Sequence, residues 1–229
     1  MIVVLLILSV VCGVLLGKYF GKNAKLAKNL LIFSAGFLIT ICLNEVFPQV
    51  YHTENHNIGI WVIAGVLLQM LLENLTKGFE HGHFHHHSDH GILPVALMAG
   101  MFVHAFIEGI PLAKETDSFS PYLTGILLHN VPISFILGAF LVKNGKFSGS
   151  SWLTIAIFAL ASPLGMLLGN YVSEEIKTYF LAIVGGIFLH ISSVIIFESN
   201  KNHNTDWQKI GMVVLGVCAA LLMHTFHHH

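Results

Sequence analysis

The sequence predicts an all-α integral membrane protein whose eight transmembrane helices form one compact bundle. Of its 229 residues, 55% are hydrophobic and only 10% are charged, and the mean hydropathy is +0.75. A soluble domain usually carries about 25% charged residues, so this composition belongs to the membrane class. Eight apolar segments are each long enough to cross a bilayer. No alternating pattern typical of a membrane β-barrel occurs in the sequence.

The first four apolar segments cover residues 2–17, 30–50, 57–76 and 92–113. No basic residue precedes the first, and no A-x-A cleavage site follows it, so we expect a retained span and not a signal peptide. Carboxylates stand near the ends of the second and third segments, at Glu45 and Glu73. The fourth carries His104 and Glu108. Ionisable groups at membrane depth are costly and usually mark an ion or substrate path.

The last four apolar segments cover residues 121–142, 151–172, 178–198 and 208–226. The fifth carries His129 and Asn130. The seventh carries His190 about two turns before Glu198, so the two could share one helix face. The eighth leads to three terminal histidines, which are either native or the remainder of a purification tag. We predict that all eight segments, residues 1–229, form a single transmembrane domain.

Three prolines and two glycines mark special backbone positions in spans four to six. Pro111, Pro132 and Pro163 each remove a backbone donor, which either kinks the helix or frees a carbonyl oxygen for a passing cation. Gly165 and Gly169 have a spacing that permits close helix contact. The sequence leaves open whether that contact lies within one chain or between two chains of a homodimer.

The distribution of lysine predicts the orientation in the membrane, since basic loops stay in the cytoplasm. All eleven basic residues are lysine. One set of alternate loops holds nine of them: Lys18, Lys22, Lys25, Lys28, Lys77, Lys143, Lys146, Lys201 and Lys209. The other set holds only Lys114 and Lys177. We therefore expect both termini outside the cytoplasm, in the plasma (inner) membrane.

A histidine-rich stretch at residues 78–91 joins spans three and four on the predicted cytoplasmic side. Such a tract is typical of weak, exchangeable metal capture. The alternative is a solvated loop without a specific role. The candidate residues are His81, His83, His85, His86, His87 and His90.

The strongest candidate site combines His104, Glu108 and His129. His104 and Glu108 are four residues apart and project from one helix face, and His129 can approach from the next span. Imidazole and carboxylate together suit Zn²⁺, and also Fe²⁺, Mn²⁺ or Co²⁺. For a single histidine such as His129, an interhelical hydrogen bond is the competing interpretation. Further candidates for a transport path are Asn130, Glu45, Glu73, His190 and Glu198.

These motifs resemble the Zrt-/Irt-like (ZIP) metal transporters. The resemblance rests on His-x-x-x-Glu-Gly from His104, on His-Asn-x-Pro from His129, and on the histidine-rich loop. It rests also on three stretches in spans two, six and seven: Leu43 to Pro48, Ser162 to Gly165, and Gly186 to His190. It implies an eight-helix permease that brings divalent metal into the cytoplasm by alternating access, with His104, Glu108 and His129 as ligands between spans four and five.

Three positions depart from the pattern of that family. Ala105 stands where the family often has Asn, Ile133 where it often has Glu, and Ser162 where it often has Glu. Family members with those extra groups can hold two metals. The substitutions therefore predict a centre for one metal in this chain, with water as a fourth ligand.

The predicted function is uptake of divalent metal, with Zn²⁺ as the first choice and Fe²⁺, Mn²⁺, Co²⁺ or Cd²⁺ as others. The metal is the cargo, so no cofactor is expected, and near-zero net charge gives no reason to expect nucleic acid. Two other functions stay open at this point. One is an intramembrane metal-dependent hydrolase with the same ligands around an activated water. The other is a sensor that binds metal without moving it.

Overall fold

The computed structural model describes residues 1–53, 57–76, 95–115, 117, 119–142, 145–198 and 206–227. Every regular element in these residues is a helix. The elements are α1 (Ile2–Phe20), α2 (Ala24–Ile41), η1 (Cys42–Val46), α3 (Phe47–Tyr51), α4 (Ile58–Thr76), α5 (Val95–Gly109), η3 (Ile110–Lys114), α6 (Pro121–Leu141), α7 (Gly149–Gly169), α8 (Glu174–Glu198) and α9 (Trp207–His227).

Eight of the described helices are long and apolar enough to cross a membrane, which confirms the predicted helical membrane fold. Elements α2, η1 and α3 together form one span of 28 residues, and α5 with η3 forms another of 20. The second span begins at Ala24, six residues before the predicted start at residue 30. Two lysines lower the hydropathy of residues 24–29, so the hydropathy pattern did not include them in the span. The side chain of Asn23 caps the helix there by accepting the Leu26 N–H at 3.0 Å.

Two of the spans change helix type next to a proline. Pro48 has no N–H to offer the carbonyl of Asn44, and the chain just before it forms the π-helical turn η1. In that turn, Phe47 N–H bonds to the carbonyl of Cys42, five residues back. Pro111 likewise cannot bond the carbonyl of Ile107, and α5 tightens there into the 3₁₀ turn η3.

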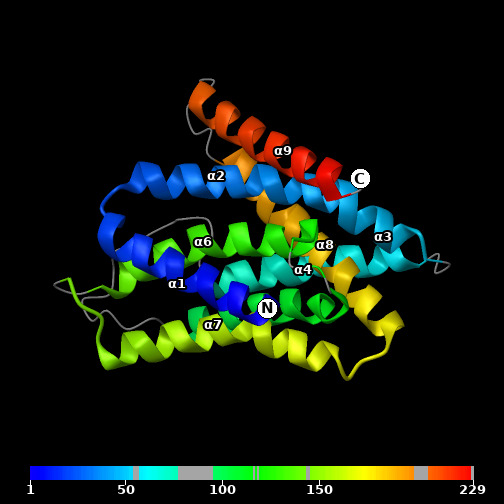
Figure 1. Cartoon of the computed structure of the whole chain (residues 1–229), viewed down its shortest axis with the longest axis horizontal. Coiled ribbons are helices and arrows are strands. Elements are labelled where there is room, and N and C mark those ends of the chain that lie inside the picture. The colour runs from blue at the N-terminus through cyan, green and yellow to red at the C-terminus, as the bar shows by residue number, and fades with distance from the viewer. Residues whose placement is uncertain are drawn as a thin grey trace.

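The spanning helices pack as four close pairs: α1 with α6, α2 with α9, α4 with α8, and α5 with α7. Figure 1 shows α2 and α9 side by side along one edge of the molecule, and α7 along the opposite edge. Glycine allows backbone contact in every pair. A Cβ atom added to Gly165 of α7 would lie 1.9 Å from the carbonyl oxygen of Phe106 in α5. The equivalent positions in the other pairs are Gly17, Gly216 and Gly186, at 2.0, 2.2 and 2.0 Å from a carbonyl oxygen of the partner helix.

The glycine contact predicted for span six therefore lies within the chain. Gly165 packs on Phe106, and Gly169 packs on Ile110, where an added Cβ would be 2.3 Å from the carbonyl oxygen. Between pairs the glycine contacts involve side chains, and a Cβ added to Gly100 of α5 would lie 2.7 Å from the Thr76 side chain of α4. A Cβ added to Gly125 of α6 would meet the Leu38 side chain of α2 at 3.5 Å, an ordinary van der Waals distance. The bundle thus consists of four pairs sealed by backbone contact, with side-chain contacts between the pairs.

Candidate metal centre

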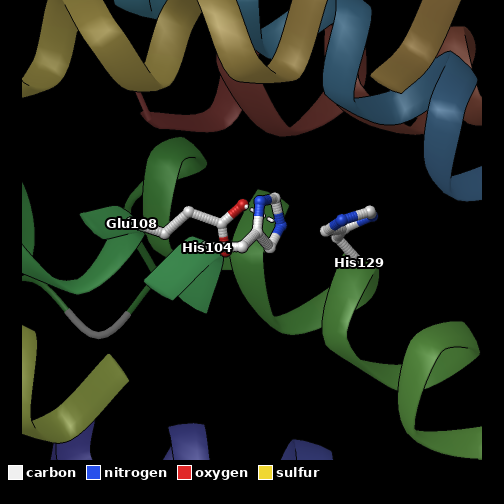
Figure 2. A group of neighbouring side chains, drawn as sticks. All are labelled: His104, Glu108 and His129. Atoms are coloured by element: carbon white, nitrogen blue, oxygen red, sulfur yellow. Dashed lines mark ion pairs between the residues drawn. The ribbon is translucent and has the colours of Figure 1, made fainter. Parts of the chain in front are cut away.

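His104 and Glu108 lie one turn apart on α5 and face each other inside the bundle. The Nε2 atom of His104 is 2.9 Å from Oε1 of Glu108, as Figure 2 shows with a dashed line. The His104 side chain is 2% exposed and that of Glu108 is 0% exposed. The helical spacing seen in the sequence thus produces a buried imidazole–carboxylate pair.

His129 approaches this pair from the neighbouring helix α6 (Figure 2). Its ring is fully buried, and the ring centroids of His129 and His104 are 5.9 Å apart in an edge-to-face arrangement. One ligand atom from each of His104, Glu108 and His129 can be chosen so that all three lie within 4.8 Å of one another. The structure therefore brings together the three residues named from the sequence, and their role as metal ligands stays a prediction.

A hydrogen bond between backbone and side chain fixes the distance between the two ligand-bearing helices. The Tyr122 hydroxyl of α6 donates to the backbone carbonyl of Glu108 at 2.9 Å. That carbonyl lies where α5 tightens into η3. The rings of Tyr122 and His129 both pack near Phe188 of α8, with centroids 6.2 and 6.4 Å from it. The aromatic rings of Tyr122 and Phe188 therefore border the cluster on this side.

Gln69 of α4 was not found by the sequence argument. Its Oε1 atom lies 3.1 Å from Nδ1 of His104, and its side chain is 0% exposed. The signal was available, because an amide inside an apolar span is as unusual as a histidine there. It was overlooked because Glu73, one turn further along the same span, carried the formal charge.

The three departures from the family pattern leave this cluster without further carboxylates. Ala105 and Ile133 are both 1% exposed, so apolar side chains occupy the core there. Ser162 is 4% exposed, and its carbonyl lies where a Cβ on Gly109 would come within 2.1 Å. In the part of the chain that the structure describes, this is the one group of three or more His, Cys, Asp or Glu residues suited to an ion.

The other candidate residues lie in three different places. Asn130 follows His129 on α6 and is 2% exposed. Glu73 of α4 pairs with His190 of α8, with Oε2 and Nε2 2.8 Å apart. Glu45 of η1 pairs with His224 of α9, a residue that the sequence argument passed over.

Two sequence predictions lie outside the described residues. The histidine-rich stretch at 78–91 is one of them, with His81, His83, His85, His86, His87 and His90. The side chain of Glu198 is the other, so the proposed shared face of His190 and Glu198 stays a prediction. The contact that the structure does give His190 is with Glu73.

The fold and the cluster together define a class: a helical integral membrane protein with a buried histidine–carboxylate group that suits a divalent cation. Comparison with known families agrees with this description. The sequence pattern of the family described as "ZIP Zinc transporter" matches residues 85–224, which is more than half of the chain. The chain belongs to the ZIP zinc transporter family.

Several named relatives are similar to this chain. Zinc transporter ZIP9 of Micropogonias undulatus is 25% identical over 210 residues, covering 78% of this chain and 67% of that protein. Zinc transporter ZIP9-A of Xenopus laevis is 28% identical over 208 residues, covering 76% and 66%. Protein zntD of Dictyostelium discoideum is 25% identical over 150 residues, covering 57% of this chain but only 22% of that protein.

The chain thus spans a fifth of the length of zntD and about two thirds of the ZIP9 proteins. Membership in a family of transporters bears on the functions that the sequence left open. It supports a transporter and argues against the metal-dependent hydrolase.

Proposed function

We propose that this protein carries divalent metal ions, Zn²⁺ first among them, across the membrane into the cytoplasm through a single-ion site formed by His104, Glu108 and His129. The buried cluster of these three side chains is the observation that carries the proposal. A carboxylate that is 0% exposed is costly to bury unless a cation or a proton accompanies it. The family membership and the names of the relatives support the same cargo.

The chemistry of the three donors suits a transported ion better than a permanently bound one. Zinc bonds to imidazole nitrogen and carboxylate oxygen at about 2.0–2.2 Å, which places neighbouring ligand atoms of a tetrahedron about 3.3 Å apart. The 2.9 Å between His104 Nε2 and Glu108 Oε1 is close to that value. Three protein ligands leave a fourth position for water, so the ion is held less firmly than in a closed structural site.

Alternating access follows from the burial of the cluster and from the pairing of the helices. An ion in a buried site reaches water only if part of the bundle moves. The ligands lie on α5 and α6, whose sealed partners are α7 and α1. α1 packs against α7 and α2 packs against α8, which joins the pairs into two sets, and α6 with α2 and α5 with α4 form the contacts between the sets. We propose that α1, α5, α6 and α7 move as one unit against α2, α4, α8 and α9.

Two histidine–carboxylate pairs on the second set of helices are suited to line the entry path and the exit path of the metal ion. Glu45 and His224 stand near the end of the second span and near the end of the last. Glu73 and His190 stand near the end of the third span and in the second half of the seventh. With the orientation given by lysine, the first pair is near the outer face and the second near the cytoplasm. We propose that the ion passes from Glu45 through the centre, beside Asn130, to Glu73 and then to the histidine-rich loop.

Uptake of Zn²⁺ into proteoliposomes tests the proposal. The parent protein should accumulate Zn²⁺ down an imposed gradient, and the double variant His104→Ala, Glu108→Ala should lose most of that flux. The double variant His52→Ala, Glu175→Ala removes the same two residue types at exposed positions and serves as the control. Equal uptake by the parent and the His104, Glu108 variant would refute the site, and binding without any flux would favour a sensor.

A further inference from the structure

The hydrogen bond between Gln69 and His104 joins two helices at the centre of the bundle. Gln69 lies in α4 and His104 in α5, and the two side chains are 0% and 2% exposed. Their contact, Oε1 to Nδ1, is 3.1 Å long. A buried polar side chain is costly unless its atoms form hydrogen bonds. The amide of Gln69 meets this condition by contacting a candidate ligand of the transported ion.

We propose that Gln69 is a positioning residue that fixes the tautomer and the ring orientation of His104. An amide oxygen can only accept, so Nδ1 of His104 donates its N–H in this contact, and Nε2 is the nitrogen left to bind a cation. Nε2 is the atom that faces Glu108 Oε1, at 2.9 Å. The two ring nitrogens therefore have separate tasks, one toward Gln69 and one toward the cation. This inference rests on the proposed function, because the tautomer matters only if His104 binds the ion.

The neutral amide is chemically suited to a site that must release its ion. Metal-binding histidines usually donate their second ring N–H to a carboxylate or a carbonyl oxygen. A carboxylate at position 69 would add negative charge and make the imidazole more basic, so the ion would be held more tightly. Gln69 orients the ring while Glu108 stays the single carboxylate of the cluster.

The bond also crosses between the two sets of helices that the proposed movement separates. α4 packs most closely with α8, whereas α5 packs most closely with α7. Displacement of α5 against α4 therefore breaks the bond between Gln69 and His104. Gln69 thus holds His104 in its binding orientation in the conformation described here, and it releases the ring when the ligand-bearing helices move.

Binding of Co²⁺ to the full-length protein in detergent tests the positioning role, since the visible absorption of Co²⁺ reports its ligand geometry. The signal of the site is the part absent from the His104→Ala, Glu108→Ala variant, which retains the other histidines. Gln69→Met keeps the size of the side chain but removes the acceptor, and it should raise the apparent Kd by about 10–100-fold. Gln69→Glu keeps an acceptor oxygen and should bind Co²⁺ at least as tightly as the parent.

The comparison of the two variants separates positioning from a structural role. If Gln69 only filled space, a carboxylate at this buried position would be tolerated less well than a thioether, and Gln69→Glu would bind more weakly than Gln69→Met. That order, or a Gln69→Met variant with the Kd of the parent, would overturn the inference. Gln208→Met is the matched control, because Gln208 bonds Asn29 at an exposed position. It should bind like the parent.

Transport measurements test the part of the inference that concerns movement. Gln69→Glu should show a lower KM and a lower maximal rate for Zn²⁺ uptake, because a stronger bond to His104 must break in each cycle. A Gln69→Glu variant with the maximal rate of the parent would overturn this part. If the parent and the His104→Ala, Glu108→Ala variant gave the same Co²⁺ signal, the proposed site itself would fail, and the inference with it. If only the role of Gln69 is wrong, the parent and the His104→Ala, Glu108→Ala variant still give different Co²⁺ signals.

Discussion

At the scale of single residues, the centre is a small set of side chains whose polar atoms are directed at one another. His104 and Glu108 share a helix face, His129 faces them from α6, and Gln69 orients His104 from α4. The arrangement carries a cost, because the Glu108 carboxylate is buried among apolar helices. Function and stability are therefore expected to oppose each other at this residue.

The variant Glu108→Gln should be more stable than the parent without metal, and unable to gain stability from it. Burying an amide costs less than burying a carboxylate, so the Tm of the metal-free variant should rise. At Zn²⁺ concentrations of about 100 times Kd, the free energy of unfolding of the parent should rise by about 2.7 kcal/mol. This corresponds to a rise of about 5–10 °C in Tm. The variant should lose this gain. Thermal unfolding in detergent measures both effects, with the exposed Glu175→Gln as control. A metal-free Tm below that of the parent would show that the carboxylate stabilises the fold.

The variant Tyr122→Phe should loosen the contact between α5 and α6. It removes the donor to the Glu108 carbonyl and should cost about 1–2 kcal/mol of stability. Zinc affinity should fall as well, because the two ligand-bearing helices are no longer held at a fixed distance. Tyr171→Phe removes the same hydroxyl from a residue that is 81% exposed and should change neither quantity. Unfolding and binding assays on the two variants provide the check, and equal behaviour would contradict the proposed tether.

At the scale of elements, prolines and glycines decide how the helices present the site. Pro111 lies in η3, just after the end of α5, and next to this turn the carbonyl of Glu108 accepts the hydroxyl of Tyr122. Pro48 accompanies the π-helical turn that carries Glu45. Glycines in each close pair let one backbone lie directly on another, as Gly165 does on Phe106. Each sealed pair should therefore behave as a stiff unit.

The variant Gly165→Ala should force α7 away from α5. Its new Cβ would lie 1.9 Å from the Phe106 carbonyl oxygen, a distance that only backbone movement can relieve. Overpacking of this kind costs about 1–3 kcal/mol, and the shift of α5 should also weaken metal binding at His104 and Glu108. Gly211→Ala is the control, because a Cβ there meets nothing within 4 Å. It should be neutral or stabilise α9 by up to about 1 kcal/mol. Similar melting curves for the two alanine variants would argue against a sealed pair.

At the scale of the whole molecule, the four pairs suggest which parts move. The cluster belongs to the pairs α1–α6 and α5–α7, while both outlying histidine–carboxylate pairs belong to α2–α9 and α4–α8 with the attached turn η1. An ion that passes from one outlying pair to the central cluster, and from there to the other pair, must therefore cross between the two sets of helices. The glycine contacts at that boundary are with side chains, such as Leu38 opposite Gly125, and a side chain can rearrange more readily than a backbone.

A disulfide across this boundary should stop transport, whereas one inside a pair should not. Thr76→Cys with Gly100→Cys links α4 to α5, where the Thr76 side chain lies 2.7 Å from a Cβ built on Gly100. Gly21→Cys with Ala139→Cys links the end of α1 to α6, where Cβ of Ala139 lies 2.6 Å from a Cβ built on Gly21, and is the control. Both are made in a background without the three native cysteines. Oxidation should abolish Zn²⁺ uptake reversibly in the first variant only. Continued uptake by the oxidised α4–α5 variant would refute the proposed movement.

The sequence by itself determined the membrane class, the eight spans and the three clustered residues. Hydropathy and helical spacing are local properties, so 55% hydrophobic residues and the four-residue step from His104 to Glu108 could be interpreted without coordinates. Only the tertiary structure showed that Gln69 contacts His104, that Glu73 pairs with His190, and that Glu45 pairs with His224. These contacts join residues 35, 117 and 179 positions apart. Helix packing decides these contacts. The helical repeat determines which residues of one helix are neighbours, three or four positions apart, but it does not determine which residues of another helix they meet.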